Sequence, residues 1–202
     1  MLEIFRNIYK TYAWGDNGDG YCSGLGSFYS PQAIIDFLKQ VTVPVHLVDL
    51  GCGDFRIGKQ LMPHCESYIG CDLVPEVIVQ NVMMNQSVNF RIVNLVEDEL
   101  PKGNICLIRQ VLQHLDNESI VNIISKCIQT YDMMIITEHI PKGKFIPNIE
   151  LPNVGNTRLD GESPSGIDIT LPPFNYKPIW TVPIETVEDG YGYVKTVVYG
   201  NR

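Results

Sequence analysis

The sequence lacks several features that are typical of nucleic-acid-binding proteins, zinc proteins and membrane proteins. It has no basic run, because 23 acidic residues outnumber 15 lysines and arginines and give a net charge of −8. The most basic cluster holds only Lys142 and Lys144. An acidic surface of this kind repels the phosphate backbone of DNA and RNA. We therefore expect no nucleic-acid partner.

Paired cysteines and long apolar runs are missing too. The six cysteines are scattered and include no Cys-x-x-Cys pair, which favours reduced thiols and argues against a metal site. No stretch of about 18 uninterrupted apolar residues occurs, so we expect no membrane span. Charges interrupt the apolar pattern of residues 1–10, which therefore does not resemble a signal peptide. These absences predict a cytoplasmic protein with neither a metal nor a membrane partner.

What the sequence does contain is an alternation of strands and helices over residues 45–137. Short apolar runs predict strands, and amphipathic or proline-started runs predict helices. The expected strands cover residues 45–50, 67–73, 88–95, 104–110 and 133–137, and the expected helices cover residues 56–62, 75–85 and 116–131. This order is typical of a three-layer α/β fold, in which helices cover both faces of a mostly parallel sheet.

The segments on either side of this core have little periodicity and many glycines and prolines. With 202 residues, the chain is long enough for one domain that includes them. Residues 139–178 are typical of a functional lid or a disordered segment. The other expected parts are helices near 2–12 and 31–40 within residues 1–40, with Ser30 as the cap of the second, and a hairpin over 179–200 that turns at Asp189-Gly190.

The stretch VDLGCGDFRIG, residues 48–58, places a Gly-x-Gly turn between a strand and a helix. Gly51 and Gly53 allow a ligand to approach the backbone closely. Dinucleotide sites need a third glycine, where this chain has Arg56, and Asp54 would lie near the pyrophosphate. S-adenosylmethionine carries no phosphate, so its site accepts an acidic residue more readily. Asp72, which ends the second strand, can accept hydrogen bonds from ribose hydroxyls and suits either cofactor.

Four motifs in sequence order resemble those of class I S-adenosylmethionine-dependent methyltransferases of a small bacterial type. They are VDLGCGDFRIG, IGCDLVPEVI, FRIVNLVEDELP and CLIRQVLQHLDNESI, and LPPFNYKP near the end of the chain is similar to that group as well. The resemblance implies a Rossmann-like fold with an antiparallel C-terminal strand, and S-adenosyl-L-methionine as the cofactor. It implies that Gly51 and Gly53 contact the methionine part of the cofactor and that Asp72 contacts the ribose. It also implies that Asn94 and Leu95 contact the adenine and that Arg109 and Gln110 close the pocket. The remaining cofactor residues that it implies are Asp49, Cys52 and Leu73.

Two residues depart from the family pattern. Phe55 stands where many members have a third glycine, and Asn94 stands where many have aspartate. The amide oxygen of Asn94 can still accept a hydrogen bond from the adenine amino group, but without a negative charge. We therefore expect a modest affinity for the cofactor.

The resemblance also implies methyl transfer to a small polar acceptor. We expect a hydroxyl of a sugar or a related metabolite, for example a surface-polysaccharide precursor, and such a hydroxyl needs a base. His139 is the first candidate, followed by His114 and Glu138. We expect His139 and Glu138 just after the fifth strand, at the carboxyl edge of the sheet where ligands bind. Each candidate site residue also has a structural interpretation, as a turn former, a helix cap or a solvated charge.

We expect residues 14–27 and 139–166 to cover the acceptor as a lid, with disordered surface loops as the alternative. The aromatic walls would come from Tyr21, Phe28, Phe145, Phe174 and Tyr176, and the contacts to an anionic group from Arg158 or Lys142. Two other functions stay open. One is a non-catalytic subunit that binds a nucleoside or stabilises a partner, and the other is an NAD-dependent oxidoreductase.

Overall fold

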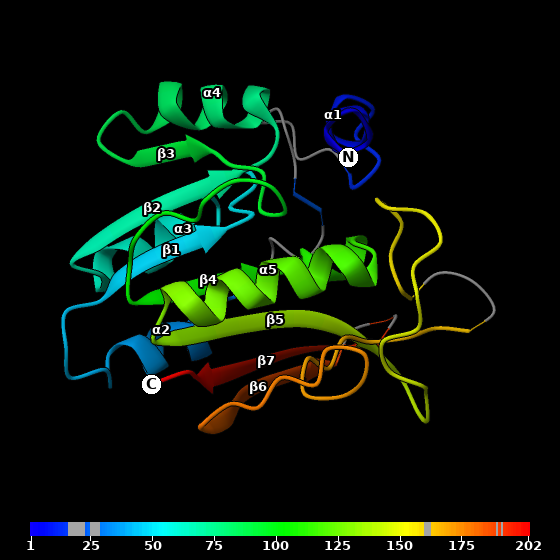
Figure 1. Ribbon diagram of the computed structural model, residues 1–202. Helices are drawn as coiled ribbons and strands as arrows, with labels where there is room; N and C mark the ends of the chain where they lie inside the picture. Colours follow the sequence, from blue (N-terminus) through cyan, green and yellow to red (C-terminus); the bar gives the residue numbers. More distant parts are fainter. Residues whose placement is uncertain (16–22, 25–28, 160–162, 189, 191) are drawn as a thin grey trace. The chain divides into compact units, whose positions relative to one another are not determined.

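The computed structural model describes residues 1–15, 23–24, 29–159, 163–188, 190 and 192–202. Its helices and strands are α1 (Leu2–Lys10), α2 (Gln32–Leu38), β1 (His46–Leu50), α3 (Gly58–Leu61), η2 (Met62–His64), β2 (Ser67–Asp72), α4 (Pro75–Met84), β3 (Asn89–Ile92), β4 (Ile105–Arg109), η3 (Leu112–His114), α5 (Asn117–Thr130), β5 (Met133–Pro141), β6 (Trp180–Glu188) and β7 (Gly192–Gly200) (Figure 1).

The strands form a seven-stranded sheet with the order β3-β2-β1-β4-β5-β7-β6. The sheet is mostly parallel, and β7 pairs antiparallel with β5 and β6. This topology confirms the expected Rossmann-like α/β class and its antiparallel C-terminal strand. The chain divides into two compact units, Met1–Cys106 and Leu107–Arg202, and β4 crosses the division.

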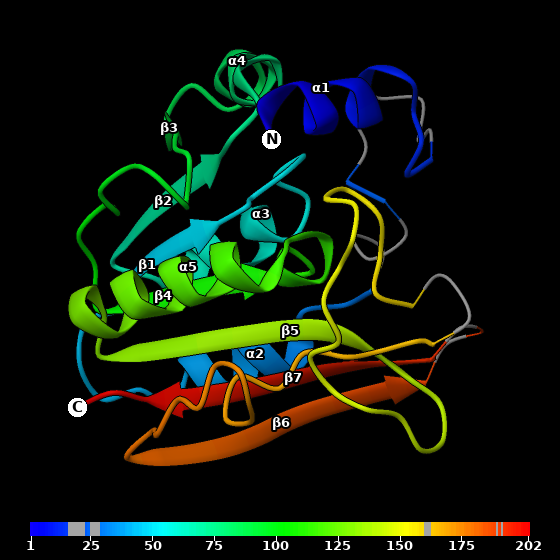
Figure 2. The ribbon, with the colours of Figure 1, turned by 45° about the vertical axis from the view of Figure 1, so that its right-hand side comes forward.

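In the first unit, β1, β2 and β3 pair in parallel. Helix α4 begins at Pro75, whose fixed φ suits the first helical position, and it contacts β2 and β3. Figure 2 shows α1 beside α4. Arg6 Nε of α1 lies 2.8 Å from Glu76 Oε1 of α4. The apolar contacts between these parts come from Leu2, Phe5, Tyr9, Trp14, Val74 and Val77.

An aromatic cluster packs beneath the glycine turn. The ring centroid of Phe55 lies 4.9 Å from that of Phe90, edge to face, and 5.4 Å from that of Tyr68. Two glycines make room for these rings. A Cβ at Gly58 would lie 2.0 Å from the Tyr68 hydroxyl, and one at Gly70 would lie 2.8 Å from the Phe90 ring. The cluster therefore fixes the position of the residues that follow the turn.

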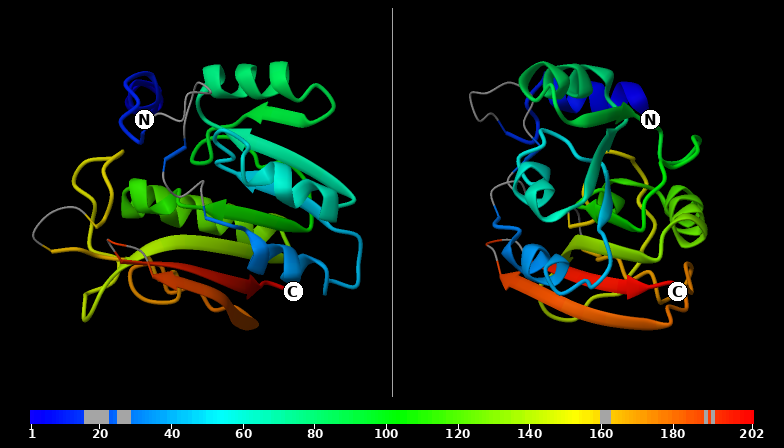
Figure 3. Two further views of the ribbon diagram at one scale, coloured as in Figure 1. Left: turned by 180° about the vertical axis from the view of Figure 1, so that it is seen from behind. Right: turned by 90° about the vertical axis from the view of Figure 1, so that its left-hand side faces the viewer.

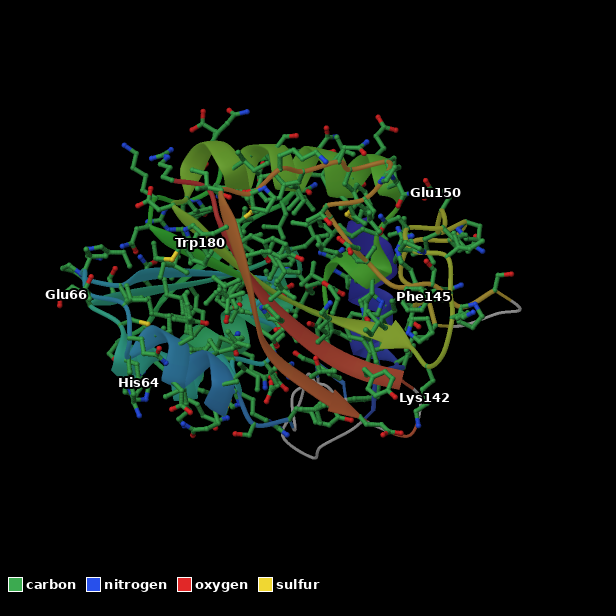
Figure 4. The ribbon with its side chains drawn as sticks, turned by 90° about the horizontal axis from the view of Figure 1, so that it is seen from below. His64, Glu66, Lys142, Phe145, Glu150 and Trp180 are labelled. Atoms are coloured by element: carbon green, nitrogen blue, oxygen red, sulfur yellow. The ribbon has the colours of Figure 1, made fainter. Side chains whose placement is uncertain are left out.

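In the second unit, helix α5 and the C-terminal strands pack around β5. Asp116 caps α5 and accepts a hydrogen bond of 2.7 Å from the backbone N–H of Ser119, as the sequence predicts. Trp180 begins β6 and lies opposite Gly200 of β7 (Figure 4). A Cβ on Gly200 would lie 2.2 Å from the indole of Trp180, so glycine leaves room for this ring. At the other end of these strands, Lys142 Nζ lies 2.6 Å from Glu188 Oε1.

Residues 142–179 connect β5 to β6, and we call them the crossover segment. Both strands run antiparallel to β7 and therefore point in the same direction. The segment must thus run back along the length of the strands, from the end of β5 to the start of β6 (Figure 3). The segment is held by its own polar side chains. Asn148 donates to the carbonyl of Asp168 at 2.8 Å, and Arg158 donates to the carbonyl of Leu115 at 2.6 Å. In its described part, the segment therefore makes specific polar contacts, and its role as a lid stays a prediction.

Three expected boundaries are wrong. Strand β5 continues to Pro141 because its pairing with β7 continues there, so Glu138 and His139 lie inside the strand and not after it. Strand β3 ends at Ile92, shortly before the chain turns at Asn94. The helix expected over 56–62 is one α-helical turn, α3, followed by the 3₁₀ turn η2, which includes Pro63.

Candidate functional site

The glycine turn follows β1 directly and has a fixed backbone. Gly51 and Gly53 have φ values of 91° and 50°, in the left-handed region that favours glycine. The carbonyl of Cys71 accepts hydrogen bonds of 2.8 Å from the N–H groups of both Gly51 and Cys52. The N–H of Gly53 donates to Asp72 Oδ2 at 3.1 Å. The turn is therefore tied to the end of β2.

The next N–H groups of the turn are bonded within the protein as well. Asp54 donates its N–H to Ser23 Oγ at 2.7 Å, Phe55 donates to the carbonyl of Cys52 at 3.0 Å, and Arg56 donates to Asp54 Oδ1 at 3.2 Å. Each N–H from Gly51 onward through Arg56 thus has an acceptor in the chain. Phosphate binding at a glycine turn depends on free N–H donors, and this turn supplies none.

Buried carboxylates surround the turn instead. Asp49 is 3% exposed and accepts a hydrogen bond of 2.6 Å from the Tyr68 hydroxyl. Asp72 is 7% exposed, and the side chain of Asp54 is 9% exposed. With three carboxylates and no free N–H donor, the turn suits a ligand that presents positive charge and hydroxyl donors, and it disfavours an anionic one.

Asp72 keeps capacity to accept further hydrogen bonds. Its Oδ1 accepts from the N–H of Val74 at 2.9 Å, and its Oδ2 accepts from the N–H of Gly53. Burial raises the pKa of Asp72 to about 6, while these N–H groups and that of Leu73 lower it. A carboxylate offers about four acceptor positions, so the ionised form can still accept from a diol.

Phe55 has a backbone conformation that favours glycine. Its φ is 62°, and its ring is buried with 2% exposure in the aromatic cluster. The Phe55 side chain therefore adds a ring below the turn without removing the left-handed conformation. Cys52, which lies inside the turn, is a free thiol, and burial raises its pKa well above the ordinary value. A protonated thiol of this kind is not a nucleophile.

Asn94 builds a local turn after β3. Its Oδ1 accepts from the N–H of Val96 at 3.0 Å, and its Nδ2 donates to Glu97 Oε2 at 2.9 Å. Its structural interpretation is thus realised, while its contact with adenine stays a prediction. Leu95 is buried with 8% exposure, and Leu73 lies between Asp72 and the cap of α4.

The other predicted cofactor residues lie in the second unit. Gln110 follows β4 with a φ of 54°, and its N–H donates to the carbonyl of Thr137 at 2.7 Å. A positive φ in a residue other than glycine is strained and is often found at functional sites. Burial raises the pKa of the Glu185 carboxyl, and the nearby Arg109 guanidinium partly offsets that rise. Their role in closing a cofactor pocket remains a prediction.

Two of the three candidate bases are bonded to backbone groups. Glu138 is 3% exposed and accepts three N–H bonds, from Val111 and Leu112 to Oε1 and from Gln113 to Oε2, at 2.9–3.2 Å. Burial raises the pKa of Glu138 to about 8. His114 Nδ1 lies 3.0 Å from the carbonyl of Asn156, so it carries the proton. Both side chains hold η3 in place.

His139 lies half-buried in β5, opposite Val194 of β7.

Other residues that the lid prediction named have structural roles. Arg158 donates to backbone carbonyls and to Asn117 Oδ1, so it is not a receptor for an anion. Tyr176 packs against Tyr199, which pairs with Met134 near the start of β5, so it cannot be a wall of a site at the carboxyl end. Tyr21 and Phe28 lie outside the described residues.

Three contributors to the site were missed in the sequence. Asn81 of α4 is 4% exposed, and its Nδ2 donates to the carbonyl of Gly53 at 2.7 Å. The sequence indicated Asn81 only by its helical spacing from Val77, which places it on the same buried face of α4. Tyr9 and Ser23 lie against the turn, and only the apolar spacing of α1 pointed to Tyr9.

Several other features carry no functional argument. A groove of about 510 Å³ is lined by Phe55, Lys59, Met62 and residues 83–88, and its lining contains none of the predicted cofactor residues. Over the described residues, no three His, Cys, Asp or Glu side chains converge as a metal site. Within the same part of the chain, no helix has the length and apolarity needed to cross a membrane.

Comparisons with known proteins support the fold. No protein-family model matches the chain, and a search of curated proteins finds no match.

Among solved structures, one similar protein is the N-methyltransferase NodS from Bradyrhizobium japonicum with S-adenosyl-L-homocysteine. It has a TM-score of 0.64 at 10% identity, over 97% of this chain and 100% of that one. The N-terminal domain of EvdMO1, crystallised with S-adenosylhomocysteine and D-fucose, has a TM-score of 0.61 at 14% identity, over 99% and 96%. Magnesium protoporphyrin IX methyltransferase from Synechocystis with bound S-adenosylmethionine has a TM-score of 0.58 at 16% identity, over 98% and 89%. At these identities the likeness establishes a shared fold.

Proposed function

We propose that the protein is an S-adenosylmethionine-dependent methyltransferase that acts on a small polar acceptor. The observation that carries the proposal is the chemistry of the glycine turn. Its N–H groups are all bonded within the chain, and three carboxylates lie around it. A pyrophosphate would meet three carboxylates and no free backbone N–H donor there, which argues against an NAD-dependent oxidoreductase.

The residues at the turn fit S-adenosylmethionine. Its sulfonium and ammonium groups are positively charged, and its ribose presents a diol. The carboxylates satisfy the positive charge, and Asp72 accepts from the ribose hydroxyls. When bound, the cofactor supplies a methyl group that the sulfonium already activates, so the protein has only to bind the acceptor, orient it and remove a proton where one is lost.

A hydroxyl of a sugar or related metabolite is the acceptor that we favour. One structural neighbour was crystallised with D-fucose, and the acidic chain disfavours nucleic acid. His139 is the base that we favour. Glu138 and His114 are committed to backbone groups of η3 and the crossover segment, and His139 follows Glu138 in β5.

The proposal is tested by binding before turnover. We expect isothermal titration calorimetry to detect S-adenosylmethionine and S-adenosylhomocysteine but not NADH. Replacing the ribose acceptor in Asp72→Asn should weaken S-adenosylhomocysteine at least about tenfold, because a hydrogen bond to a charged group contributes about 1.5–3 kcal/mol. Asp36→Asn, on an exposed part of α2, is the matched control and should not change the affinity.

The pH dependence adds a second measurement. The pKa of Asp72 is about 6, and only the ionised carboxylate accepts from both hydroxyls. The affinity of the wild type should therefore rise by about tenfold between pH 5 and pH 8, and that of Asp72→Asn should not. Binding of NADH with no binding of S-adenosylhomocysteine would refute the proposal. Cofactor binding with no methyl transfer to any sugar or nucleotide sugar tested would favour the non-catalytic alternative.

A further inference from the structure

Gln113 is a buried side chain with an unused hydrogen-bond acceptor. It lies in η3, within the stretch VLQHL of residues 111–115, and it is 7% exposed. Among the described residues, its Oε1 has no hydrogen-bond partner. A buried oxygen without a donor costs stability, and folded proteins seldom leave one. Packing alone therefore does not explain a glutamine at this position.

His114 fixes the orientation of the Gln113 amide. His114 Nδ1 lies 3.0 Å from the carbonyl of Asn156 and donates to it, so its Nε2 accepts. This Nε2 lies 3.3 Å from Gln113 Nε2, which can only donate. The amide nitrogen of Gln113 is thus used within the chain, and Oε1 is the atom left for another group.

The backbone around Gln113 does not supply the missing donor. The N–H groups of residues 111–113 donate to the carboxyl of Glu138 at 2.9–3.2 Å. Those of residues 114 and 115 donate to carbonyls of the same turn at 3.1 and 3.0 Å. Each of these N–H groups has an acceptor already, so the donor for Oε1 has to come from a bound molecule.

Gln113 lies where the proposed function expects the methyl acceptor. Turn η3 follows β4 at the carboxyl edge of the sheet, where ligands bind in α/β folds. Gly155 joins the crossover segment to this turn, because its N–H donates to the carbonyl of His114 at 2.9 Å. The N–H of Gln113 donates to Glu138, which precedes the favoured base His139 in β5.

The missing partner has a defined chemistry. An amide oxygen accepts, so the group that meets it must carry an O–H or N–H proton, which an ionised phosphate or carboxylate lacks. We infer that Gln113 Oε1 accepts a hydrogen bond from a hydroxyl of the methyl acceptor and positions that molecule for transfer. This inference rests on the proposed function, adds an acceptor-binding residue to it and restricts the acceptor to molecules with a neutral hydroxyl at this point.

The test pairs a protein variant with deoxy sugars. D-glucose, D-galactose and D-mannose, free and as nucleotide sugars, are offered with S-adenosylmethionine, and each monodeoxy form of a methylated sugar is then compared with its parent. Gln113→Met replaces the amide by an apolar chain of similar length. With the wild type, we expect one deoxy sugar to lose about tenfold or more in kcat/KM. With Gln113→Met the parent sugar should lose as much, and removal of that hydroxyl should cost less than about twofold, because Oε1 and the hydroxyl contribute only together.

Two controls separate the contact from effects on the fold. Gln129→Met makes the same chemical change on an exposed part of α5 and should not change transfer to any sugar. Gln113→Met should melt no lower than the wild type, because it removes an unsatisfied acceptor together with one hydrogen bond. A clear fall in its melting temperature would show that a buried water already satisfies Oε1, and this result would overturn the inference.

The outcomes distinguish this inference from the proposed function. If the wild type methylates a sugar and Gln113→Met does so equally well, the inference is wrong and the proposed function stands. Equal losses from the deoxy change in both proteins would also overturn it, since the hydroxyl would then meet another group. If S-adenosylhomocysteine binds but none of these sugars is methylated, the inference fails and the cofactor site stands. Absence of S-adenosylhomocysteine binding would refute the proposed function itself.

Discussion

Phe55 adopts a conformation that glycine adopts at lower cost, with a φ of 62°. For other residues the left-handed region costs about 1–2 kcal/mol. The burial of the ring between Tyr68 and Phe90 offsets that cost. The hydrogen bonds of the turn are made by backbone atoms and by the side chains of Ser23, Asp54, Asp72 and Asn81, so they do not depend on the side chain of Phe55.

Phe55→Gly should therefore separate stability from binding. We expect the free energy of unfolding to fall by about 2–4 kcal/mol, which is the loss of a buried aromatic ring less the relief of backbone strain. Urea denaturation measures this change. The affinity for S-adenosylhomocysteine should stay within about twofold of the wild type, because the turn keeps its conformation. A large loss of affinity in a folded variant would show that the ring supports the turn directly.

At the scale of secondary structure, the prediction succeeded where the pattern is local. Helix α5 lies within one residue of its expected bounds at each end, because its apolar spacing and its cap, Asp116, lie in one short stretch. Strand β5 was expected to end four residues too early, because its length depends on pairing with β7, some 60 positions further along the chain. Periodicity alone cannot report such pairing. The same limit explains why Glu138 was expected after the strand and not inside it.

Glu138 connects β5 to η3 through three backbone hydrogen bonds. Its pKa is about 8 in the folded protein, against 4.5 as the ordinary value. The folded state therefore binds the proton more tightly than the unfolded state does, and stability falls as the pH rises toward 8. Between pH 6.5 and pH 8 we expect a loss of about 1.5 kcal/mol from this group.

Glu138→Gln should reduce this pH dependence, since glutamine resembles the protonated acid and does not titrate. Urea denaturation at several pH values measures the effect. Gln113→Ala leaves the carboxyl and its backbone donors in place, so it should retain the slope of the wild type. An equal slope in Glu138→Gln and the wild type would mean that another group causes the loss. Asp72 does not confuse the result, because its pKa of about 6 lies below this range.

For the whole molecule, the sequence predicted the fold class and the order of the core strands, since short apolar strands alternate with helices. It could not predict the hydrogen bond between Ser23 and the glycine turn, because Ser23 has no periodic pattern around it and meets Asp54 across 31 positions of the chain. It also gave no sign of the two compact units, Met1–Cys106 and Leu107–Arg202. The predicted cofactor residues are distributed over both units, with Asp72 in the first and Arg109 in the second.

The chain's two tryptophans allow each unit to be followed separately. Trp14 lies in the first unit and Trp180 in the second. Trp180→Phe leaves Trp14 as the probe, and Trp14→Phe leaves Trp180 as the probe.

At 100 times its Kd, S-adenosylhomocysteine should stabilise the native state by about 2.7 kcal/mol. The role predicted for Asp72 implies a rise of the melting temperature at Trp14, and the roles predicted for Arg109 and Gln110 imply one at Trp180, each by about 5–11 °C. Asp72→Asn is the control in both backgrounds and should shrink both shifts together. A shift at Trp14 with none at Trp180 would show that binding involves the first unit alone, and the roles predicted for Arg109 and Gln110 would then be wrong.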